Sequence, residues 1–143
     1  MKELVADLVA YLKTKDNLTD FLSRLDTALL DLSLSDLSQL NLYFTHQEIA
    51  LLATTISDVN QLKELRARLS RIAVFTVKLA FKPSAFFESQ VNNFIIKAVK
   101  DLCVIQIVFD RSILGGAIID FQGKYRDYSL RAAIEEWRRK RAL

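Results

Sequence analysis

Few residues of this 143-residue chain have types and spacing suited to chemistry. The glycines at 116 and 123, with a lysine at 124, superficially follow a phosphate-binding loop. That motif needs a glycine at 118 and a serine or threonine at 125, where the chain has Ile118 and Tyr125. The spacing therefore excludes a phosphate-binding loop.

The remaining reactive side chains are isolated. His46 is the only histidine and lies in a sequence typical of a helix start, which favours a surface position over a general base. Cys103 falls on the apolar face of an expected strand, so we expect a buried small hydrophobic side chain. Glu135 and Glu136 are adjacent on an expected helix and point in different directions. No Cys/His cluster has metal-ligand spacing, so we expect no catalytic site, metal or cofactor.

All three glycines of the chain lie in one segment, residues 110–129. Glycine is favoured where the backbone needs a positive φ or where another backbone passes close by. Gly115 and Gly116 precede an apolar run over 117–121, and the pair 122–123, with Gly123 second, suits a tight hairpin turn. The return strand is expected over 124–128. The segment therefore predicts a β-hairpin with constrained geometry at both ends.

A basic helix is expected directly after the hairpin. Ser129 is placed to cap it, because a serine hydroxyl can accept from a free N–H of the first turn. Leu130, Ile134 and Trp137 form one apolar stripe together with an alanine. Arg138 and Arg139 begin a basic last turn, where the helix dipole favours cations.

Composition and charge limit the class of protein. Half of the residues are hydrophobic, which is enough to bury a core, yet no apolar run approaches the ~20 residues of a membrane span. The first residues lack the layout of a signal peptide, and a lone cysteine suits a reducing compartment. Residues 1–72 carry a net charge of −2 and residues 73–143 carry +5. A basic half fits an acidic protein partner, nucleic acid or an acidic membrane surface, or only solvated helix ends.

The hydrophobic periodicity changes near residue 72. Before it, helical stripes begin at residues 4, 21, 49 and 62, a break is expected over 14–17, and residues 32–44 suit either a short helix or a strand. After it, alternating residues indicate a strand over 75–81, a helix over 84–100 with Phe94 and Ala98 facing inward, and a second strand over 103–109. We therefore expect an α+β fold: a reduced N-terminal helical bundle of four to five helices over 1–72, then a β-α-β-β-β-α domain over 73–143.

The glycine-containing segment and the helix after it resemble the C-terminal signature of the delta subunit of F-type ATP synthase, called OSCP in mitochondria. The resemblance covers residues 73–141, with an ungapped motif from 110 to 131. Its positions here are Asp110, Ser112, Gly115, Gly116, Gly123, Asp127, Ser129 and Arg131. Two positions depart from the pattern: the turn glycine lies one place late, and Arg126 replaces an aliphatic residue. The first 72 residues match only loosely, because six helices would need roughly 90–100 residues.

The resemblance implies a non-catalytic peripheral-stalk subunit. In that family the N-terminal bundle holds the alpha subunits and the C-terminal domain holds the b-subunit stalk, so that rotor torque drives ATP synthesis. It implies no small-molecule substrate, only indirect membrane contact, and a place on the cytoplasmic face of a cell inner membrane. For the b-subunit interface, the apolar stripe and the basic end offer five candidates: Leu130, Ile134, Trp137, Arg138 and Arg139.

Two alternatives remain open from the sequence. The E-type stalk subunit of V/A-type ATPases has a similar ending, but it begins with a long uninterrupted helix, whereas this chain shows breaks. A small nucleic-acid-binding α+β domain is the other, because Tyr125 and Tyr128 lie beside Lys124 and Arg126 and aromatic residues among cations can stack on bases.

Overall fold

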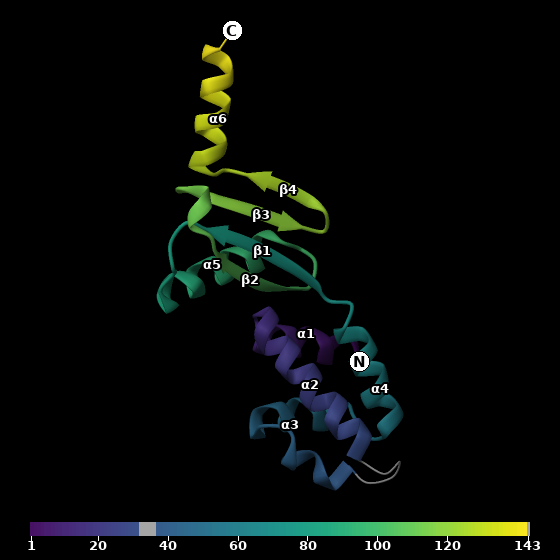
Figure 1. Ribbon diagram of the computed structural model, residues 1–143. Coiled ribbons are helices and arrows are strands. Elements are labelled where there is room, and N and C mark those ends of the chain that lie inside the picture. The colour runs from purple at the N-terminus through teal and green to yellow at the C-terminus, as the bar shows by residue number, and fades with distance from the viewer. Residues whose placement is uncertain (32–36, 143) are drawn as a thin grey trace. The chain divides into compact units, whose positions relative to one another are not determined.

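The computed structural model describes residues 1–31 and 37–142. Its contacts divide the chain into two compact units, Met1–Ile72 and Ala73–Leu143. Within the described residues the first unit is helical and the second is a four-stranded mixed sheet with two α-helices (Figure 1). The expected α+β fold class is confirmed, as is the β-α-β-β-β-α order of the second unit.

The first unit contains four α-helices and one 3-10 helix among its described residues. In chain order they are α1 (Lys2–Leu12), α2 (Lys15–Asp31), η1 (Leu37–Leu42), α3 (His46–Ala53) and α4 (Val59–Leu69). Each α-helix buries one apolar stripe, as in the fully buried Leu8, Phe21, Leu52 and Leu65. The ambiguous stretch 32–44 is helical over Leu37–Leu42, and its first five residues lie outside the described part of the chain.

The break between α1 and α2 is shorter than expected. It occupies Lys13 and Thr14 only, and Lys13 has a positive φ of 60°. Asn17, expected in the break, lies in α2 and reaches back to donate from Nδ2 to the carbonyl oxygen of Leu12 at 2.9 Å. That bond satisfies one of the free carbonyl groups at the end of α1.

An ion pair between a partly exposed arginine and a buried carboxylate joins α2 to the start of α3. Both Nη atoms of Arg24 donate to the Glu48 carboxylate, at 2.7 and 2.8 Å, and the Glu48 side chain is only 3% exposed. Glu48 also accepts from the backbone N–H of Thr45 at 2.8 Å, which completes the expected capping box. Burial pushes the pKa of Glu48 upward, but the bonds from Arg24 and Thr45 outweigh it and hold that pKa below its ordinary value.

The second unit is built around a sheet of order β2-β1-β3-β4. Its strands are β1 (Ala73–Leu79), β2 (Cys103–Phe109), β3 (Ala117–Phe121) and β4 (Lys124–Asp127). β1 and β2 are parallel and connected by α5 (Ala85–Ala98), whereas β1 with β3 and β3 with β4 are antiparallel. The two antiparallel strands β3 and β4 form the expected hairpin, and its turn residues Gln122 and Gly123 both have positive φ, 50° and 77°.

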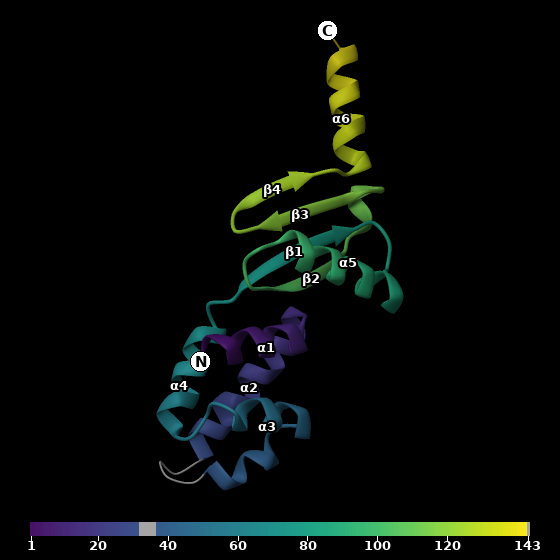
Figure 2. The same ribbon diagram turned by 180° about the vertical axis from the view of Figure 1, so that it is seen from behind.

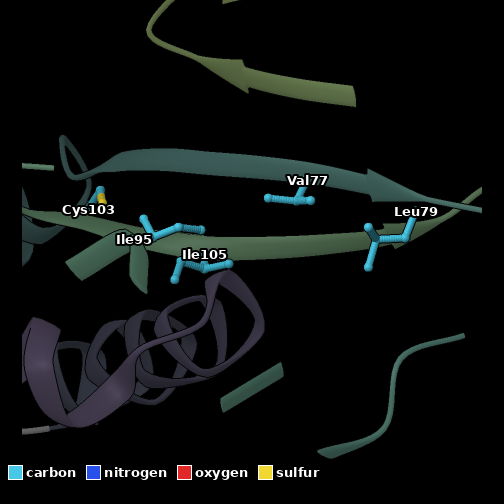
Figure 3. Close-up of a cluster of buried hydrophobic side chains, with 5 residues drawn as sticks. All are labelled: Val77, Leu79, Ile95, Cys103 and Ile105. Atoms are coloured by element: carbon cyan, nitrogen blue, oxygen red, sulfur yellow. The ribbon is translucent and has the colours of Figure 1, made fainter. Parts of the chain in front are cut away.

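One hydrophobic cluster of this unit lies between a face of the sheet and α5 (Figures 2 and 3). The buried members of this cluster are Val77, Leu79, Ile95, Cys103 and Ile105. The expectation for α5 was partly wrong, because Phe94 is 72% exposed and Ala98 is also exposed. The buried stripe of α5 is narrower than its apolar pattern: it centres on Ile95, with Phe87 and Val91 partly buried beside it.

Candidate functional site

The glycine pair and the start of the last helix are fastened together by main-chain atoms. The carbonyl oxygen of Gly115 accepts from the N–H of Leu130, and that of Ala117 accepts from the N–H of Tyr128, each at 2.9 Å. Gly116 has φ +73°, and a Cβ at this position would collide with the carbonyl group of Tyr128. We call this junction between residues 110–117 and 127–131 the latch. It requires glycine at 116 for both conformation and space.

Two aspartates shape the two sides of the latch in the same way. Oδ1 of Asp110 accepts from the N–H of Ser112, and Oδ1 of Asp127 accepts from the N–H of Ser129, each at 2.9 Å. Such bonds from an aspartate to the backbone two residues on stabilise tight turns. Asp110 thereby opens the short 3-10 helix η2 (Arg111–Ile113), and Asp127 leads from β4 into α6 (Leu130–Arg141).

Ser129 and Arg131 complete the junction. Oγ of Ser129 accepts from the N–H of Ala132 at 3.2 Å, so Ser129 is the expected N-cap of α6. Arg131 reaches from α6 back to η2, where its Nη1 donates to Oγ of Ser112 at 3.3 Å. The first turn of α6 is therefore attached to η2 by side chains as well as by the main chain.

The electrostatics of the latch favour ionised aspartates. Hydrogen bonds from Ser112 hold the pKa of Asp110 below its ordinary value, and the positive charges of Lys78 and Arg131 act in the same direction. Hydrogen bonds from Ser129 lower the pKa of Asp127, again with help from Arg131. Both carboxylates act as acceptors for backbone N–H groups, so they set the geometry of the two turns.

Beyond the latch, α6 extends away from the sheet (Figure 1). None of its residues is buried; Leu130 is 50% and Trp137 55% exposed, while Ile134 is half-buried. The guanidinium of Arg141 lies over the Trp137 ring at 4.4 Å from its centroid. The apolar stripe expected on this helix is thus present and faces solvent along much of its length.

The structure brings most of the motif residues together. Seven of them meet in the latch: Asp110, Ser112, Gly115, Gly116, Asp127, Ser129 and Arg131. Gly123 lies apart at the hairpin tip, where a Cβ would meet nothing within 4 Å. The five interface candidates, Leu130, Ile134, Trp137, Arg138 and Arg139, all lie on α6.

Groups with possible reactivity are scattered in the described part of the chain. Residues 1–31 and 37–142 contain no group of three or more His, Cys, Asp or Glu side chains that could hold a metal ion. Cys103 is buried, and this burial raises the pKa of its thiol, with Asp101 adding to the effect. None of the helices in those residues has the length and apolarity needed to cross a bilayer.

Three features were missed from the sequence. Phe86 and Phe94 leave an exposed aromatic face on α5, which the apolar count of that helix could have indicated. The Arg24–Glu48 ion pair joins residues 24 apart, and nothing local indicates it. The third is an apolar depression of about 280 Å³ between η1 and α3 in the first unit. Its lining residues are Leu37, Ser38, Leu40, Asn41, Ile49, Leu52, Ala53 and Ile56.

Comparison with known protein families identifies the family of this chain. The family described as ATP synthase delta (OSCP) subunit matches residues 14–140, which is most of the chain. The chain belongs to the ATP synthase delta (OSCP) subunit family. It is therefore a peripheral-stalk subunit of an F-type ATP synthase, as the C-terminal motif indicated. The match begins at residue 14, so it also includes most of the helical unit, which resembled the family only loosely.

Solved structures add a similar chain in the cryo-EM structure of the Polytomella F-ATP synthase, primary rotary state 3. It is 24% identical, and the alignment covers 48% of this chain and 89% of that one, with a TM-score of 0.39. A TM-score of this size adds nothing to the family assignment, which rests on the sequence match. No curated protein sequence matches the delta-family chain significantly.

Proposed function

We propose that this delta-family subunit is a non-catalytic clamp between the catalytic head and the stator of F-type ATP synthase. The first unit, Met1–Ile72, binds the alpha subunits, and the second unit, Ala73–Leu143, binds the b subunit. The subunit then keeps the alpha/beta head from turning with the rotor, so that torque drives ATP synthesis. It lies at the cytoplasmic face of the cell inner membrane and reaches that membrane only through the complex.

The exposed stripe of α6 is the observation that supports b binding. Leu130, Ile134 and Trp137 form a partly solvent-exposed apolar row on a helix that is held by hydrogen bonds at its base. Apolar rows on surface helices of single domains normally face a core. Trp is also enriched among residues that dominate binding energy. In a stalk subunit, the b subunit is the partner that would cover this surface.

The apolar depression in unit 1 supports a separate site for the alpha subunits. It is lined largely by leucine, isoleucine and alanine side chains from η1 and α3, and its volume suits a few apolar side chains of a partner segment. Ala53 lies at this depression and is exposed, so it can be changed without disturbing the core.

Recovery of partners from native membranes tests the function. The tagged chain is used as bait, and captured proteins are identified by mass spectrometry. Alpha, beta and b subunits in stoichiometric amounts are the expected result. Capture of nucleic-acid-associated proteins, or oligonucleotide binding that weakens with salt, would instead favour the nucleic-acid function, for which Tyr125 and Tyr128 are indeed exposed.

Binary binding assays with purified partners then separate the two sites. Trp137→Ala, or charge reversal at both Arg138 and Arg139, should weaken binding of the soluble part of b while alpha binding is kept. Ala53→Glu should do the opposite, because it places a charge in the apolar depression. Ala67→Glu on the exposed face of α4 is the matched control. Unchanged b affinity in the first pair of variants would contradict the assignment of the b site to α6.

A further inference from the structure

The two edge strands of the sheet, β4 and β2, differ in length and in charge (Figure 1). β4 has four residues, and Lys124, Arg126 and Asp127 among them are charged. β2 has seven residues, Cys103–Phe109, without a charge, a proline or a glycine. Natural edge strands are normally short, charged or interrupted, because a long apolar edge pairs readily with other chains. β2 therefore lacks the protection that β4 has.

The outer side of β2 presents a defined set of main-chain groups. Asp110, directly after β2, donates its N–H to the carbonyl oxygen of Leu79 at 2.8 Å, so the main chain at residue 110 faces β1. Successive residues of a paired strand alternate in this respect, so the even-numbered residues of β2 bond to β1. The N–H and C=O groups of the odd-numbered residues then point away from β1, and within the described residues β1 is the only strand paired with β2.

The sequence of β2 reads nearly the same in both directions from its centre, Gln106. An isoleucine stands on each side, at 105 and 107, and a valine follows on each side, at 104 and 108. If two copies run antiparallel about Gln106, each isoleucine lies opposite an isoleucine of the second copy and each valine opposite a valine. A symmetric contact between identical subunits requires a surface that is complementary to itself in this way.

We propose that two copies of this chain pair through β2, antiparallel about Gln106, so that the two four-stranded sheets become one continuous sheet. Ile105 and Ile107 form hydrogen-bonded pairs across this interface, because their main-chain groups point outward. Gln106 meets Gln106 of the second copy at a non-hydrogen-bonded position, where opposite side chains come closest. The inference goes beyond the proposed function, which requires no second copy.

Helix α5 adds apolar surface to the same contact. It packs over β2, with Ile95 buried against the sheet. At about 100° of rotation per residue, Phe94 and Ile96 lie on opposite flanks of α5, and they are 72% and 50% exposed. In the paired sheet the two α5 helices cover the same face next to each other. Whichever flank faces the second copy therefore brings an exposed apolar side chain to the interface.

An extended segment of another protein is the competing occupant of this edge. Strand addition takes its affinity from main-chain hydrogen bonds, which any extended segment can supply. An unrelated segment, however, gains nothing from the symmetry about Gln106. A second copy of this chain matches β2 at each pair of positions around that centre, and so fits the edge better.

Sedimentation velocity of the full chain at rising concentration tests the pairing. The unchanged chain should approach twice the mass of the monomer. Gln106→Lys and Gln106→Glu should each weaken the dimer by about fivefold or more, because like charges then lie directly opposite each other. An equimolar mixture of these two variants should restore it. Tyr125→Lys is the matched control, because Tyr125 lies in the same row across the sheet but at the opposite edge, and it should leave the dimer unchanged.

Hydrogen exchange of the unchanged chain gives a second readout that does not depend on how the variants fold. The amides of Ile105 and Ile107 should exchange about tenfold more slowly at high concentration than at low. The amide of Gln106, which already bonds to β1, should change less.

Three results would overturn the proposal. The first is a chain that stays monomeric at every concentration. The second is a dimer that survives both Gln106 variants or that Tyr125→Lys weakens to the same extent. The third is a mixture of folded Lys and Glu variants, checked by circular dichroism, that remains monomeric.

Discussion

The backbone of Gly116 lies directly against the carbonyl group of Tyr128, closer than any side chain would allow. This contact brings the strand that follows η2 to the start of α6 and leaves the Gly115 carbonyl in place to accept from Leu130. The direction of α6 therefore depends on the absence of one Cβ atom.

A methyl group at this position should disrupt the latch. Gly116→Ala combines a positive φ with a collision against main-chain atoms, which cannot move as a flexible side chain could. We expect a loss of about 3 kcal/mol or more in the free energy of unfolding. Gly123→Ala also has a positive φ but open space around it, and it should cost only about 1–2 kcal/mol. Hydrogen exchange of β1 and β3 amides, followed with rising urea, measures both; equal losses would show that conformation alone matters.

Removal of Arg24 should strongly destabilise the helical unit. Arg24→Met leaves the buried Glu48 carboxylate without its main partner, and such changes cost roughly 3–5 kcal/mol. Arg66→Met breaks an exposed pair with Asp26 in the same unit and should cost less than about 1 kcal/mol. Hydrogen exchange of α2 and α3 amides, read by mass spectrometry, separates this unit from the other. Similar exchange in the two variants would contradict a structural role for the Arg24–Glu48 pair.

The same pair predicts an acid-sensitive helical unit. Because the pKa of Glu48 is lower in the folded chain than its ordinary value of 4.5, the ionised form stabilises the fold above that pH. This stabilisation is lost as pH falls from about 4.5 through the folded pKa. Glu48→Gln should be less stable than the unchanged chain at pH 7, and its stability should decline less below pH 4.5. Denaturation of both proteins by urea between pH 3 and 7, followed by helical circular dichroism, provides the comparison.

Neighbouring residues on α5 should respond very differently to substitution. Ile95 is buried in the sheet core, and Ile95→Ala should cost about 2–5 kcal/mol. Phe94 is 72% exposed, and Phe94→Ser should change stability by less than about 1 kcal/mol. Thermal unfolding of the two variants, monitored by circular dichroism, tests this difference. A large effect of Phe94→Ser would mean that the aromatic face is covered in solution.

The buried cysteine should be unreactive in the folded chain. Burial raises the pKa of the Cys103 thiol, so less thiolate is present at neutral pH than for a free cysteine. We expect slow labelling by a disulfide reagent in buffer and rapid labelling in urea. Introducing a cysteine at the exposed Ser89 of α5, in a chain with Cys103→Ser, gives the accessible reference. Equal labelling rates at the two positions would contradict the buried location.

The features that the sequence predicted well depend on local rules. The capping box at Thr45, the cap at Ser129 and the turn at Gln122–Gly123 each need only a few consecutive residues, and all three are confirmed. The features that it missed depend on distant partners. The inward assignment of Phe94 failed because periodicity shows which residues share a face, but not how much of that face the sheet covers.

In the candidate site, too, the sequence predicted the local features and missed those that depend on distant contacts. The motif indicated which residues belong together. The latch itself depends on a close contact between the main chains of Gly116 and Tyr128. Apart from the glycine, no side-chain type in the sequence indicates that contact. The sequence also did not decide whether Trp137 is buried or exposed. A helix that packs on the sheet and a helix that awaits a partner both have the same apolar stripe, and in the structure Trp137 is exposed.

The hydrogen bonds of the latch also define a path for mechanical load. A pull on α6 passes covalently into β4 and, through the Leu130–Gly115 and Tyr128–Ala117 bonds, into the start of β3. β3 is paired in turn with the other inner strand, β1. Tension applied at one exposed helix is thus shared between two strands and delivered to the middle of the sheet, instead of peeling away the edge strand alone.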